Sequence, residues 1–164
     1  MVCALLVLAG AFKFARPAAT AGALRAVHLP SRIALVRVIG LAEVVLGAGA
    51  GLTFSPALLA LTAAAYLAFA GFVVVALRAD APLQSCGCFG QVDTPPSALH
   101  VALNLAAGAT VLAAAVTHTP SPGHTMSEQP WSGLPFVLLV GVCVYLSVAI
   151  LTVLPMTIGS RHRA

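Results

Sequence analysis

Five long runs of apolar residues constrain the fold of this 164-residue chain more than any other feature of its sequence. The runs cover residues 1–14, 33–54, 57–77, 98–116 and 134–158. The whole chain has 8 Lys or Arg and 4 Asp or Glu, too few to cover the exterior of a soluble domain. Because lipid cannot hydrogen-bond an exposed backbone, runs of this kind must be helical. The sequence therefore predicts an all-α, polytopic membrane bundle, with a four-helix core plus a fifth, C-terminal transmembrane helix.

Prolines, glycines and polar residues divide the chain within a single membrane domain, residues 1–164. We expect a core at 1–118, an exposed loop at 119–133 and the additional transmembrane helix at 134–158. The first run is short, because 14 helical residues reach about 21 Å across a hydrocarbon core of about 30 Å. We expect a membrane helix with missing or minimal upstream sequence, since it lacks the basic start of a signal peptide. Residues 16–31 then form an interfacial segment with some helix.

Glu43 is the acidic residue within the apolar runs, and it lies on a face of small residues that is expected to meet another helix. These small residues are Gly40, Gly47 and Gly51. A buried carboxylate needs a partner. Arg37 precedes Glu43 by six residues and lies about 120° away around the helix, so Lys13 of the first run is the better partner. Lys13, Arg37 and Glu43 are the candidate polar core, either as a structural clamp, with Lys13 reaching the interface, or as a catalytic group.

His100 and Asn104 are four residues apart and share one face of the fourth run, close to the polar loop at 78–97. They are candidates to hydrogen-bond a cofactor, for example the carbonyl of a membrane quinone. Hydrogen bonding between helices is the commoner use of such residues in membrane proteins and stays the alternative.

The four cysteines fall into two classes. Cys3 and Cys143 lie inside apolar runs, where Cys usually packs as a small hydrophobe. Cys86 and Cys88 flank Gly87 in the polar loop. Residues two apart can reach the Cα separation of a disulfide, and glycine permits so small a ring, whose strain makes it exchange readily. The spacing favours redox chemistry over a metal site, because the pair supplies only two ligands; inert loop thiols are the equal alternative.

Taken in order along the chain, several residues resemble the MauE family of methylamine-utilisation membrane proteins, within the wider DoxX-like group. The matching residues lie within 1–110 and are Lys13-Phe14, Pro17, Leu29-Pro30, Glu43, Cys86-Gly87-Cys88-Phe89-Gly90 and Asn104. The CGCFG string is the most specific of these matches. The chain departs from the family pattern in its short first run and in its fifth run, which adds Cys143.

This resemblance implies a multi-pass protein of the bacterial inner membrane. Its implied role is to work beside a thioredoxin-like partner in maturing a disulfide-rich extracytoplasmic client, as in biogenesis of the methylamine dehydrogenase small subunit. It further implies that Cys86 and Cys88 are the exchanging thiols and that Lys13 and Glu43 support the core. Family members also occur in bacteria without methylamine metabolism, so the client itself is not implied.

The resemblance implies that the thiols face the extracytoplasmic side, and the basic residues argue against this. With five spans, one side of the bundle carries Arg16, Arg25, Arg32, Arg78, Arg161 and Arg163. The positive-inside rule makes this side cytoplasmic, and it also holds Cys86 and Cys88, whereas stable disulfide donation is expected outside the cytosol. We expect extracytoplasmic thiols from the resemblance, with a cytosolically reduced pair as the alternative. The scattered arginines also lack the aromatic-basic clustering of a nucleic-acid site.

Two classes of function follow from these features. The first is a thiol-disulfide redox protein that relays electrons between a thioredoxin-like partner and either quinone or another thiol. The second is a non-catalytic membrane scaffold that stabilises a partner protein. A transporter ranks below both, because no two-half repeat or broken-helix pair is evident in the sequence.

Overall fold

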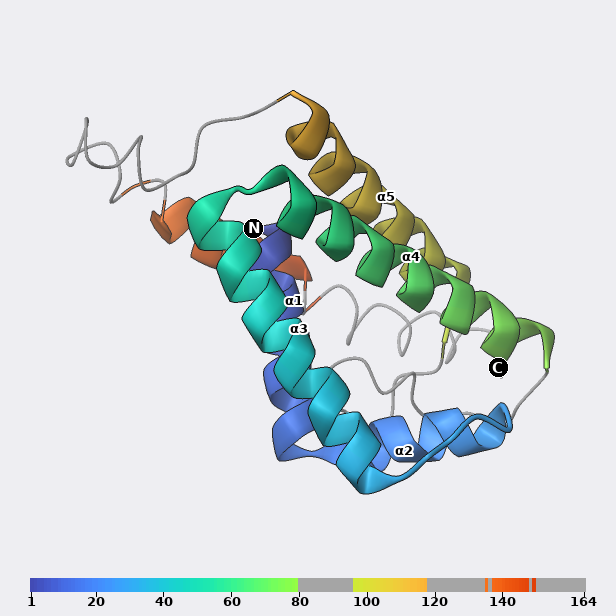
Figure 1. The fold of residues 1–164 in the computed structure, drawn as a ribbon. Helices are drawn as coiled ribbons and strands as arrows, with labels where there is room; N and C mark the ends of the chain where they lie inside the picture. Colours follow the sequence, from blue (N-terminus) through green and yellow to red (C-terminus); the bar gives the residue numbers. More distant parts are fainter. Residues whose placement is uncertain (80–95, 118–134, 136, 148, 150–164) are drawn as a thin grey trace.

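The described part of the computed structural model is entirely helical in its regular structure and covers residues 1–79, 96–117, 135, 137–147 and 149 (Figure 1). The main helices are α1 (Val2–Ala15), α2 (Pro17–Ala26), α3 (Ile33–Thr53), α4 (Pro56–Arg78) and α5 (Ala98–Val116). A shorter apolar helix covers Val137–Ser147. The predicted all-α class of a helical membrane bundle is confirmed.

Three of these helices, α3, α4 and α5, are long and apolar enough to cross a membrane. Their outward side chains include large apolar groups such as Leu52 and Val45, exposed by 77% and 65%, which suits contact with lipid. The first run forms α1, which meets α2 at 91°, so the two helices together form a bent span or a re-entrant turn. Of the fifth run, the structure describes the helix Val137–Ser147 and little else. The count of five spans therefore stays a prediction.

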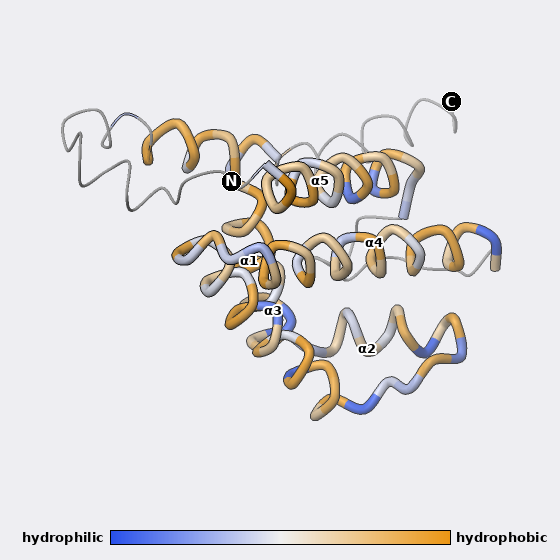
Figure 2. The backbone as a smooth tube through the Cα atoms, turned by 45° about the horizontal axis from the view of Figure 1, so that its top comes forward, coloured by the Kyte–Doolittle hydropathy of each residue, from blue (hydrophilic) through white to orange (hydrophobic). Residues whose placement is uncertain are grey.

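The bend between α1 and α2 has a local cause. Arg16 departs from helical angles (φ −130°, ψ 65°), and Pro17 begins α2, where its missing N–H costs nothing. The interfacial segment at 16–31, which was predicted to contain some helix, thus contains a helix of ten residues, α2. Exposed arginines gather around α2, the start of α3 and the end of α4. Figure 2 shows this side of the bundle as the more hydrophilic one.

The bundle consists of two antiparallel helix pairs, α1 with α3 and α4 with α5 (Figure 1). The pairs are joined at Phe54 and Ser55, where Phe54 takes a left-handed conformation (φ 50°) and Pro56 opens α4. From this turn α3 and α4 diverge. Near the turn lies a core of apolar side chains: Ala50, Leu59, Ala63, Val111 and Ala115. The buried charged side chains, Lys13 and Glu43, lie farther along, toward the α2 end.

Candidate functional site

Lys13 of α1 and Glu43 of α3 form a buried ion pair between the two helices. The Lys13 Nζ donates to the Glu43 Oε2 at 2.7 Å, and each side chain is 6% exposed. A bond between two charged groups this short is of the stronger kind, and burial shields it from water and salt. The predicted partner of Glu43 is the one that the structure places beside it.

Glycines allow α1 and α3 to approach closely enough for this pair. A Cβ on Gly10 would lie 2.5 Å from the Gly40 carbonyl oxygen, and one on Gly40 would lie 2.7 Å from the Gly10 carbonyl oxygen. A Cβ on Gly47 would likewise lie 2.8 Å from the Cys3 carbonyl oxygen. Lys13 and Glu43 each follow one of the crossing glycines by three residues, so both side chains project from the crossing. The predicted contact face of α3 is confirmed, and α1 is the helix that it meets.

Arg37 is a correction to the predicted polar core. Its side chain is exposed, while Lys13 and Glu43 are buried. The reason is the helical phase, because six residues turn Arg37 away from the face that Glu43 occupies. Arg37 lies five residues after Arg32, which precedes α3, so its long side chain is placed to reach the polar interface.

Two aromatic side chains of α4 complete the surroundings of Lys13, and neither was predicted from the sequence. The Lys13 Nζ lies 4.6 Å from the centre of the Phe69 ring, a cation-π distance. Tyr66 packs edge-on against Phe69, with ring centres 6.0 Å apart, and its hydroxyl donates to the Val2 carbonyl at 2.8 Å. These contacts tie the α1–α3 pair to α4.

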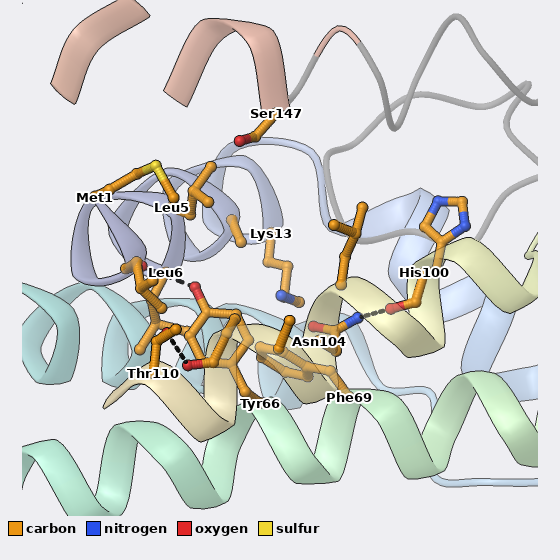
Figure 3. Close-up of a pocket in the computed structure, with 15 residues that line it drawn as sticks. Met1, Leu5, Leu6, Lys13, Tyr66, Phe69, His100, Asn104, Thr110 and Ser147 are labelled. Atoms are coloured by element: carbon orange, nitrogen blue, oxygen red, sulfur yellow. Dashed lines mark hydrogen bonds between the residues drawn. The ribbon is translucent and has the colours of Figure 1, made fainter. Parts of the chain in front are cut away.

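A cavity of about 190 Å³ lies between α1, α4 and α5, and Ser147 of the short helix also borders it (Figure 3). Most of its wall is apolar, from residues such as Leu5, Leu6 and Leu103. Its polar lining residues are Lys13, Tyr66, His100, Asn104, Thr110 and Ser147. In Figure 3 the Lys13 ammonium and the Asn104 amide are directed toward the same part of the cavity. The space thus combines an apolar body with a polar end, as small-molecule sites commonly do.

His100 and Asn104 both border this cavity, but they differ in what they offer to it. The Asn104 Nδ2 donates to the His100 carbonyl at 2.7 Å, which leaves the side-chain oxygen of Asn104 as an acceptor. The His100 ring is 2% exposed and bonds the Ser97 hydroxyl at 2.8 Å through Nδ1. Figure 3 shows this ring directed away from the Asn104 side chain. His100 therefore holds the first turn of α5, while Asn104 faces the cavity.

The predicted thiol motif, Cys86-Gly87-Cys88-Phe89-Gly90, lies outside the described residues. Its neighbours are described: α4 ends at Arg78 and α5 begins after Ser97, so the motif belongs to the connection between these helices. Cys3 and Cys143 are free thiols of intermediate exposure within helices. Within the described residues, His, Cys, Asp and Glu form no group of three that could hold a metal ion.

A protein-family model matches most of the chain. The model of a family described as "Methylamine utilisation protein MauE" matches residues 1–120. The matched region contains α1 to α5, the Lys13–Glu43 pair and the connection that carries Cys86 and Cys88. No curated protein and no solved structure matches the chain.

Proposed function

The chain belongs to the MauE family, and we propose that it is a membrane-embedded thiol-disulfide relay for the maturation of an extracytoplasmic, disulfide-rich client. The observation that carries the proposal is the position of Cys86-Gly87-Cys88. The motif lies within the matched region, in the connection that ends at Ser97. Ser97 is hydrogen-bonded to His100 in the first turn of α5, and His100 borders the polar-ended cavity. The setting is a multi-pass bundle in the bacterial inner membrane, with a thioredoxin-like protein as partner.

The proposed reaction is a thiol-disulfide exchange between the loop and the client. A client thiolate attacks the Cys86–Cys88 disulfide, which forms a mixed disulfide and releases one loop thiolate. The second client thiol then displaces the loop, so the client leaves with a disulfide and Cys86 and Cys88 remain as two thiols. Two electrons have passed to the loop, and another acceptor must remove them before the next turnover.

Replacing the two loop cysteines tests this reaction. We expect the Cys86→Ser/Cys88→Ser protein to accumulate normally in membranes and to lose oxidation of a reduced dithiol peptide, followed by mass spectrometry. Cys143→Ser is the matched control, because it removes a thiol that is outside the motif, from the helix Val137–Ser147. Unchanged peptide oxidation by the double variant would refute the relay and favour the alternative, a non-catalytic scaffold.

The side of the membrane is a separate part of the proposal. The arginines around α2 and the end of α4 favour the cytoplasm for the loop, whereas the family role requires extracytoplasmic thiols. A membrane-impermeant maleimide applied to intact, reduced cells separates the two, in a background where Cys3 and Cys143 are serine. We expect labelling of Cys86 and Cys88 without permeabilisation. Labelling only after permeabilisation places the pair in the cytoplasm.

A further inference from the structure

We propose that the cavity between α1, α4 and α5 binds the head of a membrane quinone, with the Lys13 ammonium as hydrogen-bond donor to one quinone carbonyl. The inference rests on the proposed thiol relay only for the source of the electrons. The binding itself is argued from the cavity, its charges and its polar end.

The size and lining of the cavity suit a substituted ring. An engineered protein cavity of about 150 Å³ binds benzene, so a space of about 190 Å³ has room for a six-membered ring with small substituents. Leu5, Leu6 and Leu103 provide the apolar wall that such a ring needs. Because α4 and α5 are long and apolar enough to cross a membrane, a ligand dissolved in the bilayer shares the environment of helices that line the cavity.

The charges of the site select a neutral ligand. Glu43 lies 2.7 Å from the Lys13 ammonium and balances its charge, so the ion pair offers an anion no net positive charge. An ammonium has three N–H donors, and Glu43 accepts one of them. A neutral carbonyl can accept another without disturbing the ion pair. This chemistry fits a quinone better than a carboxylate or phosphate ligand.

A second polar group, Asn104, allows the cavity to bind both the quinone and the quinol. The free side-chain oxygen of Asn104 accepts hydrogen bonds and would take the O–H of a quinol, while Lys13 donates to the carbonyl of the quinone. When the quinone takes two electrons from the Cys86 and Cys88 thiols, it also takes the two protons that they release. The products are a quinol and the Cys86–Cys88 disulfide. A charge-assisted bond from Lys13 stabilises the negative charge that builds on the oxygen during this reduction.

Binding is measured on the full chain in mild detergent, with decyl-ubiquinone as the probe and bound quinone quantified after equilibrium dialysis. We expect saturable binding of about one quinone per chain. Ala107→Phe fills the cavity from α5 and is expected to weaken binding at least tenfold. Ala109→Phe on the outward face of the same helix is the control for partition into the micelle and keeps wild-type affinity.

A second variant removes the Lys13 ammonium donor without leaving the Glu43 carboxylate buried and unpaired. In Lys13→Gln/Glu43→Gln both charges are lost together, so the bundle is expected to fold, and quinone affinity falls about tenfold through loss of the charge-assisted bond. Binding that is absent from the wild type, or equal in the wild type, Ala107→Phe and the double-glutamine variant, overturns the proposal. Co-purified phospholipid that the quinone does not displace overturns it as well.

The cysteine variant separates this proposal from the relay. Cys86→Ser/Cys88→Ser is expected to bind decyl-ubiquinone as tightly as the wild type, because the loop thiols are not needed for binding. If the wild type binds quinone but Cys86 and Cys88 never form a disulfide, the relay is refuted and the quinone site is retained. A wild type that oxidises the dithiol peptide but does not bind quinone refutes the quinone site and leaves the relay standing.

Discussion

The two helix pairs of this bundle are packed by different means. In the α1–α3 pair, backbone meets backbone at glycines, and a Cβ on Gly10 would lie 2.5 Å from the Gly40 carbonyl oxygen. In the α4–α5 pair, a Cβ on Gly108 would lie 3.5 Å from the Ala63 carbonyl oxygen, an ordinary contact. The first pair has no room to adjust. The α4–α5 pair packs through side chains, and a cavity lies between this pair and α1.

This difference explains how a flexible side chain such as lysine can have a fixed position. The glycine crossing sets the separation of α1 and α3, and Glu43 then holds the Lys13 ammonium at 2.7 Å. Phe69 of α4 lies against the same ammonium. The tight pair therefore presents a preoriented donor to the cavity of the looser pair, as a binding site requires.

The largest effect is expected from breaking the ion pair on one side only. Lys13→Met leaves Glu43 as a buried carboxylate without its partner, and we expect a loss of about 3–5 kcal/mol in unfolding free energy. Glu43→Leu on its own should cost a similar amount. The two together should recover most of it, measured by unfolding in detergent. A double variant as unstable as either single one contradicts a balanced pair.

The next effect tests the glycine crossing against the looser pair. Gly40→Ala forces a Cβ to within 2.9 Å of the Phe14 backbone nitrogen and is expected to cost about 1–3 kcal/mol. Gly108→Ala is the matched control, since its Cβ meets only ordinary contacts and alanine favours the helix. We expect it to leave thermal stability in detergent unchanged or slightly raised. Equal losses in both variants would remove the distinction between the pairs.

A smaller effect is expected where the two pairs are tied together. Tyr66→Phe removes the hydroxyl that donates to the Val2 carbonyl at 2.8 Å and should cost about 1 kcal/mol. Tyr145→Phe, at a tyrosine exposed by 73%, controls for loss of a hydroxyl outside this contact. The same unfolding assay measures both. A Tyr145→Phe protein less stable than Tyr66→Phe would contradict the assigned tie.

The smallest effect is expected from Arg37. Because this side chain is exposed and turned away from Glu43, Arg37→Gln should leave the unfolding free energy in detergent unchanged. A loss comparable to that of Lys13→Met would return Arg37 to the polar core.

The long helices could be predicted from the sequence almost to the residue. The runs at 33–54, 57–77 and 98–116 correspond to α3, α4 and α5, because Ser55-Pro56, Arg78 and Ser97 interrupt the apolar pattern sharply. The sharp angle between α1 and α2 could not be predicted. Pro17 indicates a break in the chain, but the direction of the next helix depends on what it packs against.

The site was predictable where charge limits the choice of partner. A buried carboxylate must be paired, and excluding Arg37 by its helical phase leaves Lys13 for Glu43. Tyr66 and Phe69 gave no such signal, since an aromatic residue within an apolar run does not reveal which helix it faces. Gly10 could have been found, because it precedes Lys13 by three residues as Gly40 precedes Glu43. The cavity depends on how α3 and α4 diverge, which no local pattern encodes.

Electron transfer from the loop to the quinone is measured by following the loop thiols as quinone is added. The purified chain is reduced, freed of reductant and mixed with decyl-ubiquinone under anaerobic conditions, and the thiols of Cys86 and Cys88 are counted by alkylation and mass spectrometry. We expect an internal Cys86–Cys88 disulfide and one quinol per chain, both formed much more slowly in Ala107→Phe. Thiols that stay reduced while quinone is bound, or that oxidise equally fast in Ala107→Phe, would contradict this expectation.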